Sequence, residues 1–119
     1  SLNAARLRAI QRHGQMVAAF DAETVDRAWA ATKTQQLQAM LQSLGQRFQP
    51  NNIICRRTSC RVEVPLSRPL TAAEERQWLN EWMRREPCTF YLADMSVIDG
   101  TPRANRLFAI VSCGQASSP

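Results

Sequence analysis

The spacing of four cysteines constrains the fold of this chain more than any other feature of its sequence. Cys55 and Cys60 bracket a short polar segment, with extended-looking sequence on both sides. Cys88 and Cys113 lie at equal distances from the Asp-Gly-Thr-Pro turn at residues 99–102. A β-hairpin at each site places the two members of a pair opposite one another, within the Cα separations that disulfides need. The sequence therefore predicts two cross-strand disulfides, Cys55–Cys60 and Cys88–Cys113.

Two other uses of these cysteines fit their spacing less well. Zinc ligands usually come as paired close knuckles, and only one close pair occurs here. Reactive cysteines usually sit in a C-x-x-C motif or beside a histidine. The single histidine, His13, is far away in sequence, and we expect it on a helix surface. Since disulfides persist in oxidising compartments, the pairing predicts an exported protein, or the exported part of one, without a metal or cofactor.

Helical spacing and capping residues predict two helices in the first part of the chain. Residues 2–20 carry apolar or small residues at helical spacing, namely Leu7, Ile10, Gly14 and Val17. Asp21 is a candidate cap for a second helix, with Glu23 in its first turn and Gly45 as its C-terminal stop. The first helix is marginal in water unless packed. We therefore expect residues 2–19 to dock on their own domain or to form a homodimer with a second copy.

The remainder of the chain predicts four strands and one helix. Residues 53–55 form a short strand, and residues 60–64 alternate apolar and charged residues, as a half-buried strand does. A capping box at residues 71–74 begins a helix, which is expected to bury Trp78, Leu79, Trp82 and Met83. Residues 89–98 and 107–111 are rich in strand-forming residues. The Asp-Gly-Thr-Pro segment between them, at residues 99–102, is typical of a turn.

This order of elements predicts an α+β fold. A chain of 119 residues that is 45% hydrophobic forms one ordinary globular domain. Without the first helix, the order is αββ twice. Two such units form a four-stranded antiparallel sheet with helices packed on one face, a permuted ferredoxin-like arrangement, plus the extra N-terminal helix. The expected organisation is an N-terminal helix at 1–20, a domain at 21–114 and a frayed tail at 115–119.

The charged residues predict a structural network. Glu23 and Asp26 lie three residues apart, and Arg56 and Arg61 flank the first hairpin. We expect an ion-pair set that joins helix and hairpin, with an arginine within hydrogen-bonding reach of Glu23 or Asp26. The alternative is an enzyme that uses these two acids for acid–base chemistry. The sequence contains no nucleotide-binding, nucleophile-elbow or zinc-protease motif, and no small-molecule substrate is evident.

The net charge of +5 indicates either a solvated basic face or a surface for an acidic partner, nucleic acid or an anionic membrane. Nucleic-acid binding is not predicted, because Trp78 and Trp82 belong to an apolar stripe and an exported address argues against it.

No stretch approaches the ~18 consecutive apolar residues that span a membrane. The first residues are neither the apolar core of a signal peptide nor a cleavage site. If the protein is exported, we expect a leader or a membrane anchor to precede this sequence in the full-length protein.

Two segments together resemble a known group. The first has the pattern F-x2-E-x2-D-x2-W-A at residues 20–30, and the second has C-R-x3-C-R-V-E at residues 55–63. The combination resembles an uncharacterised group of bacterial exported domains, often found behind a signal peptide or a single membrane anchor. The resemblance covers about residues 20–64 and implies export and a Cys55–Cys60 bridge. It assigns no catalytic role to any residue of this chain.

These observations predict a non-catalytic, exported protein-binding domain. The first expectation is the periplasmic part of a bacterial envelope-anchored protein, whose partner is another envelope or periplasmic protein. The alternative is a soluble periplasmic inhibitor or immunity-type protein that binds one enzyme through a compact patch. A transmembrane segment in the full-length gene favours the first, and a cleavable leader or lipobox favours the second.

Overall fold

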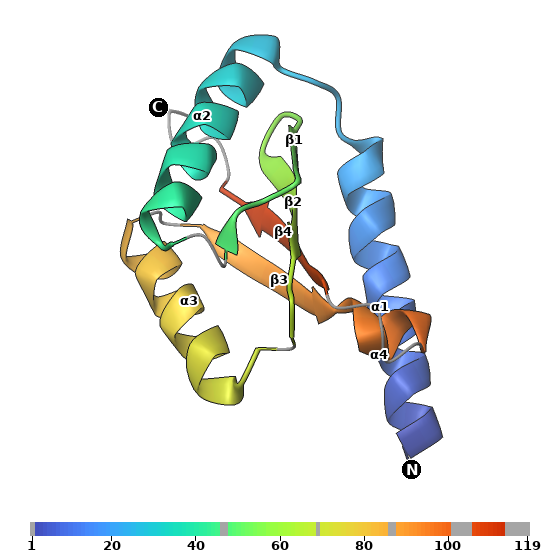
Figure 1. Ribbon diagram of the computed structural model, residues 1–119. Helices are drawn as coiled ribbons and strands as arrows, with labels where there is room; N and C mark the ends of the chain where they lie inside the picture. The colour runs from blue at the N-terminus through green and yellow to red at the C-terminus, as the bar shows by residue number, and fades with distance from the viewer. Residues whose placement is uncertain (1, 46–47, 69, 86–87, 101–105, 114–119) are drawn as a thin grey trace.

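A four-stranded antiparallel sheet lies between two layers of helices (Figure 1). The computed structural model describes residues 2–45, 48–68, 70–85, 88–100 and 106–113. The strand order is β1-β2-β4-β3, and the elements in chain order are α1 (Leu2–Ala22), α2 (Arg27–Ser43), β1 (Asn52–Cys55), β2 (Ser59–Pro65), α3 (Ala72–Arg85), β3 (Thr89–Asp94), α4 (Met95–Asp99) and β4 (Arg106–Ser112). The predicted α+β fold is confirmed.

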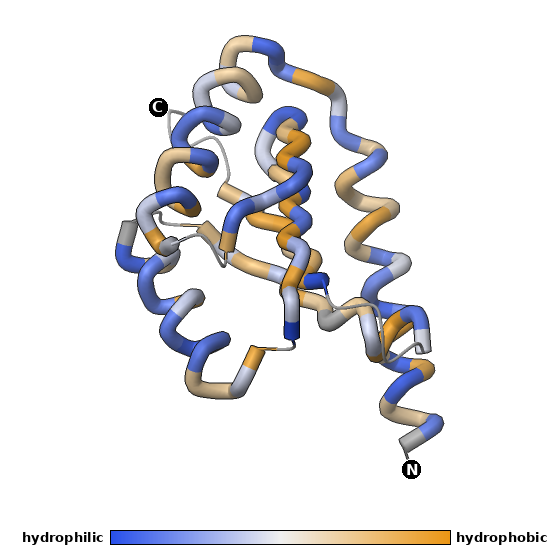
Figure 2. Tube along the Cα trace, viewed as in Figure 1, coloured by the Kyte–Doolittle hydropathy of each residue, from blue (hydrophilic) through white to orange (hydrophobic). Residues whose placement is uncertain are grey.

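Helices α2 and α3 cover one face of the sheet, which we call the inner face. Trp78 and Trp82 of α3 are fully buried there, with their rings edge to face at a centroid distance of 4.7 Å. The strands add apolar side chains to this core, and in Figure 2 the trace of β2 alternates between hydrophobic and hydrophilic residues. Met83 was expected in the same core, but its side chain is 58% exposed. It lies beside Trp82 in sequence, and α3 turns only one stripe toward the sheet.

Helix α1 packs on the opposite, outer face. Its contact stripe is His13, Met16, Val17 and Phe20, which lie on one side of the helix. Leu7, the first residue of the predicted stripe, is 64% exposed. The difference arises because the second half of α1 lies over the sheet, whereas its first half extends along α4 (Figure 1). Of the two expectations for residues 2–19, the structure therefore has α1 docked on its own domain.

The boundary between α1 and α2 differs from the prediction. Helix α1 continues through Asp21 to Ala22, and the N-cap of α2 is Asp26, whose carboxylate accepts a hydrogen bond of 3.1 Å from the backbone of Trp29. Glu23 therefore lies between the two helices instead of in the first turn of the second. The predicted cap at Asp21 is wrong because Asp26, three residues before Trp29, supplies the same chemistry.

The second hairpin keeps the predicted register with a different connection. Thr89 pairs with Ser112 and Asp94 with Leu107, so Cys88 and Cys113 flank the open end of the pair. Residues 95–98 were predicted to continue the strand, but they form the short helix α4. Helix α4 is followed by Gly100, which has a left-handed φ of 71° that suits glycine. Residues 101–105 and the expected frayed tail at 115–119 lie outside the described residues.

The start of α3 agrees with the sequence in detail. Thr71 donates its backbone N–H to Oε1 of Glu74 at 3.0 Å, and Glu74 donates its own to the hydroxyl of Thr71 at 3.1 Å. This reciprocal pair is the predicted capping box. Local chemistry within four residues decides it, which is why the sequence could predict it.

Candidate functional site

Two disulfides join the strands on the inner face. Cys55–Cys60 links β1 to β2 with a Cα separation of 4.0 Å, and Cys88–Cys113 joins the residues that flank β3 and β4 with a separation of 4.2 Å. These are the two predicted pairs, and no cysteine is free. The bonds indicate an oxidising environment. In the described part of the chain, no helix is long and apolar enough to cross a membrane.

Glu23 fastens the α1–α2 junction to the first hairpin. Its carboxylate Oε1 accepts three backbone hydrogen bonds from the turn between β1 and β2, at distances of 2.9–3.2 Å, from Arg57, Thr58 and Ser59. Burial on its own raises the pKa of Glu23, but the hydrogen bonds from the turn outweigh it and lower the pKa below its ordinary value. The carboxylate therefore stays ionised and acts as an anchor for the hairpin.

Arg56 completes this junction from the hairpin side. Its guanidinium donates to the backbone carbonyl of Glu23 at 3.3 Å, lies 4.9 Å from the ring centroid of Phe20, and is 3.8 Å from the carboxylate of Asp21. The carboxylate of Asp26 caps α2, and its backbone N–H donates to the carbonyl of Arg56. Arg56 therefore lies within hydrogen-bonding reach of Glu23, as predicted, and joins helix and hairpin. Its hydrogen bond goes to the backbone carbonyl of Glu23, and its ion pair goes to Asp21.

Arg61 has a different partner from the predicted one. Its side chain bonds Glu63 at 2.8 Å and lies 4.9 Å from the ring centroid of Phe108. Residues two apart on a strand share a face, so Glu63 is the nearest acid to Arg61. This part of the ion-pair prediction is therefore wrong. Arg61 belongs to the outer face, under α1.

These contacts bear on the acid–base alternative. A general acid or base works best with a pKa near the operating pH, and Glu23 is shifted in the opposite direction. Asp26 holds the first turn of α2. Within the ranges that the structure describes, no cluster of three His, Cys, Asp or Glu side chains is placed to hold a metal ion. Both predicted acids therefore have structural roles, Glu23 in binding the hairpin turn and Asp26 in capping α2.

His13 lies between α1 and the sheet. Its Nδ1 is 2.9 Å from the hydroxyl of Tyr91, and its ring is edge to face with Phe108 at 4.8 Å. Burial, followed by the charge of Arg61, lowers the pKa of His13 from its ordinary value, while Asp99 opposes the shift. The sequence placed His13 on a helix surface. It is half-buried instead, because α1 turns this side toward β3 and β4.

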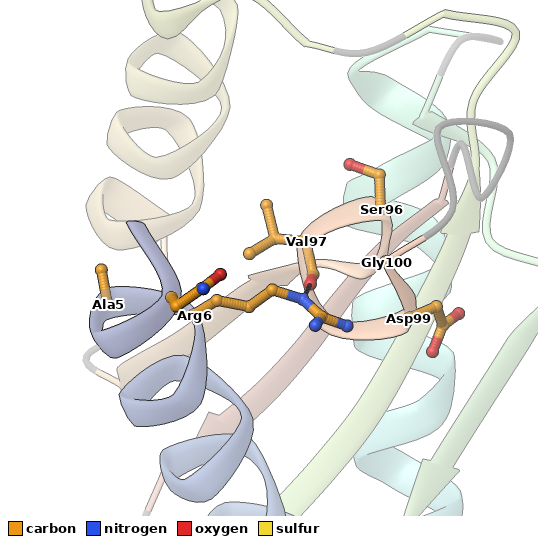
Figure 3. Close-up of a pocket in the computed structure, with 7 residues that line it drawn as sticks. Ala5, Arg6, Ser96, Val97, Asp99 and Gly100 are labelled. Atoms are coloured by element: carbon orange, nitrogen blue, oxygen red, sulfur yellow. Dashed lines mark hydrogen bonds between the residues drawn. The ribbon is translucent and has the colours of Figure 1, made fainter. Parts of the chain in front are cut away.

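A wide hollow of about 690 Å³ separates the start of α1 from α4 (Figure 3). Arg6 crosses it and donates from Nε to the carbonyl of Val97 at 3.1 Å. The guanidinium packs against Gly100, where an added Cβ would lie 2.6 Å from it. Asp99 on the rim pairs with Arg106 at 3.6 Å. Arg6 and Asp99, the charged residues of this hollow, already have partners within the protein. The contacts of Arg6 therefore anchor α1 to α4.

The outer edge of β3 is a second candidate surface. Strand β3 ends the sheet and pairs with β4 on one side only. A hollow of about 470 Å³ lies on its α3 side, lined by Leu79, Met83, Phe90 and Leu92 among others. A second hollow of about 350 Å³ lies on its α1 side, lined by Ala9, Arg12, Tyr91 and Val97 among others. Sequence reasoning missed this site, because strand order in space decides which strand is an edge.

Comparison of the chain with models of known protein families, with curated proteins and with solved structures finds no match. Its function is therefore inferred from its own geometry. The β3 edge, with a hollow on each side, is the feature of that geometry on which the proposal below is based.

Proposed function

We propose that this protein is a non-catalytic, exported protein-binding domain, and that it binds its partner at the edge of β3. The observation that carries the proposal is a strand edge that pairs with no other strand among the described residues and has a hollow on each side. Exposed edges present backbone donors and acceptors to any strand that approaches, and proteins usually blunt them. This edge carries apolar side chains, and Met83 and Val97 beside it are 58% and 45% exposed.

The cellular address in this proposal is the bacterial periplasm. Two disulfides support an oxidising compartment. The pattern at residues 20–64 supports an envelope protein, through its resemblance to bacterial exported domains. We infer that the domain is the periplasmic part of an envelope-anchored protein and that another envelope or periplasmic protein binds it.

Site-specific crosslinking in the living cell tests the proposal. A photoreactive amino acid replaces Met83 in the protein expressed from its full-length gene. The matched control places the same amino acid at Gln35, which is exposed on α2 and belongs to neither hollow beside β3. We expect one envelope or periplasmic protein to be crosslinked from position 83 and not from position 35. Identical products from both positions, or none from position 83, would overturn the proposal.

The same experiment separates the alternative function. A soluble inhibitor or immunity-type protein also gives a crosslink, but its partner is a single enzyme whose activity falls when the domain is added. Mass spectrometry of the crosslinked product identifies the partner. An assay of that partner with and without the domain then decides between the two kinds of binding protein.

A further inference from the structure

The geometry points to an extended segment of the partner that joins the sheet as a fifth strand, with acidic side chains toward α1 and apolar side chains toward α3. This inference rests on the proposed function and specifies its binding mode. It follows from three features of the β3 edge: the backbone that is free to pair, the apolar hollow on the α3 side, and the arginine on the α1 side.

The backbone gives the first step. All six residues of β3 pair with β4, from Thr89–Ser112 to Asp94–Leu107, so the opposite edge of β3 is the outer edge of the sheet. A strand of this length spans roughly 20 Å, enough for several backbone hydrogen bonds with an added strand. Side chains of an added strand point alternately to the two faces. They therefore enter the α3 side and the α1 side in turn.

The α3 side selects apolar side chains. Leu79 and Met83 come from α3, and Phe90 and Leu92 come from β3 itself. The volume of about 470 Å³ accommodates aliphatic or aromatic groups. Methionine is unbranched and adapts its shape to a bound group. Glu75 at the rim of the same hollow adds a negative charge that disfavours an acidic side chain there.

The α1 side selects acidic side chains. Arg12 lines this hollow, and its guanidinium lies 5.6 Å from the ring centroid of Tyr91. In the part of the chain that the structure describes, no carboxylate forms a salt bridge with Arg12. A carboxylate from an added strand gains a charge-assisted hydrogen bond with it. The net charge of +5 attracts an acidic segment over a longer range.

The surroundings of the edge favour a single strand over a second copy of the chain. Helices α1 and α3 border the two hollows, and α4 adds Val97 and Ile98 on the α1 side. An extended segment fits between these walls, whereas a second copy brings its own helices and a further charge of +5. Like charges oppose that association. The occupant we assign is therefore an extended acidic–apolar segment of another protein.

A designed peptide tests the inference directly. The probe is a synthetic peptide of about nine residues in which glutamate and valine alternate, added to the isotope-labelled chain. We expect the backbone amide signals of residues 89–93 and the side-chain signal of Arg12 to shift. A peptide of the same composition, with its glutamates and valines in separate blocks, should bind at least tenfold more weakly. Equal binding of the two peptides, or shifts confined to another surface, would falsify the inference.

Methylation of the peptide backbone isolates the strand pairing. Residues that share a face of a strand also send their N–H groups to the same edge. One version of the probe is therefore N-methylated at every glutamate and another at every valine, so that each loses the donors of one edge only. We expect one version to lose at least tenfold in affinity and the other to keep most of it. If both bind alike, no fifth strand forms.

Charge reversal tests the role of Arg12. Arg12→Glu should weaken the glutamate–valine peptide at least tenfold and improve binding of a lysine–valine peptide. Arg27→Glu is the matched control, because it makes the same charge change at an exposed site on α2 and leaves the β3 edge intact. Equal losses in the two variants would show that net charge, and not Arg12, selects the peptide.

Two results distinguish the possible failures. A crosslink from position 83 without peptide binding at β3 leaves the proposed function standing and overturns the fifth strand. A chain that sediments as a dimer with the residue 89–93 amides protected would make a second copy the occupant. Loss of both the crosslink and the peptide contact would remove the proposed function as well.

Discussion

The two faces of the sheet hold their helices by different means. The inner face is apolar along its length, buries both α3 tryptophans and carries both disulfides. The outer face holds α1 through a smaller cluster around Phe20, Tyr91 and Phe108, with His13 and Arg61 among the aromatic rings. The described contacts that hold α1 there are non-covalent. From this difference we expect most of the folding stability to come from the inner face, and the outer face to respond more to charge and pH.

The largest effect is expected from truncation of the inner core. Trp82 is fully buried, with the ring of Phe90 at 5.0 Å and that of Trp78 at 4.7 Å. Trp82→Ala should lower the free energy of unfolding by about 4–5 kcal/mol, and Phe20→Ala on the outer face by about 3 kcal/mol. Urea denaturation measures both. Met83→Ala is the control and should change stability by less than about 0.5 kcal/mol.

A greater loss from Phe20→Ala than from Trp82→Ala would break the comparison between the faces. If the Phe20→Ala variant also lost the NMR signals of the contact between His13 and Tyr91, the comparison between the faces would be sharper. Helix α1 would then be the part of the molecule that loosens.

The disulfides rank next. Their sequence separations are 25 residues for Cys88–Cys113 and 5 for Cys55–Cys60. On the chain-entropy model, the longer bridge contributes about 3.5 kcal/mol and the shorter one about 2 kcal/mol. We expect Cys88→Ser with Cys113→Ser to lower the melting temperature more than Cys55→Ser with Cys60→Ser does. If the variant without Cys55–Cys60 had the lower melting temperature, this disulfide would act mainly by holding the hairpin turn that Glu23 binds.

A smaller effect is expected at Glu23. Glu23→Gln keeps the shape of the side chain and removes the charge that strengthens its backbone hydrogen bonds, so a loss of about 1–2 kcal/mol is expected. Glu75→Gln, at an exposed site, is the control. Because the pKa of Glu23 is lowered by folding, its stabilisation is present at neutral pH and lost as the pH falls below about 4.5. The free energy of unfolding of the Glu23→Gln variant, measured against pH, should not show this loss.

The smallest effect concerns His13. Folding lowers its pKa, through burial and the charge of Arg61, against the opposing charge of Asp99. The unfolded chain therefore binds the proton first, and stability should fall as the pH drops below about 6.5. His13→Gln should flatten the curve between pH 7.5 and 5.5, measured by urea midpoints. A curve that stays unchanged would show that α1 does not respond to this proton.

Local chemistry explains what could be predicted from the sequence. The capping box at Thr71 and Glu74 and the symmetric spacing of Cys88 and Cys113 each depend on residues close in sequence or on one hairpin register. The fold class followed from the order of these elements. The Asp21 cap failed because Asp26, a few residues on, offers the same side-chain chemistry.

The candidate site could not be predicted in the same way. The β3 edge exists because β4 lies between β2 and β3, and Arg12 and Met83 meet it from helices on opposite faces. No spacing rule relates residues 12, 83 and 90. The contacts of Arg61 were misassigned for a similar reason, since the nearest acid on its face of the strand is Glu63.

The sequence by itself determined the order of the elements other than α4, the pairing of the cysteines and the apolar inner core, because each of these follows from periodicity, capping chemistry or hairpin symmetry. Tertiary structure decided that α1 covers the outer face, that His13 faces Tyr91 and that β3 stands at an edge. These features depend on which faces remain to be buried after the sheet has formed. Burial of apolar surface is non-directional, so it selects the docked arrangement only when the whole domain is assembled.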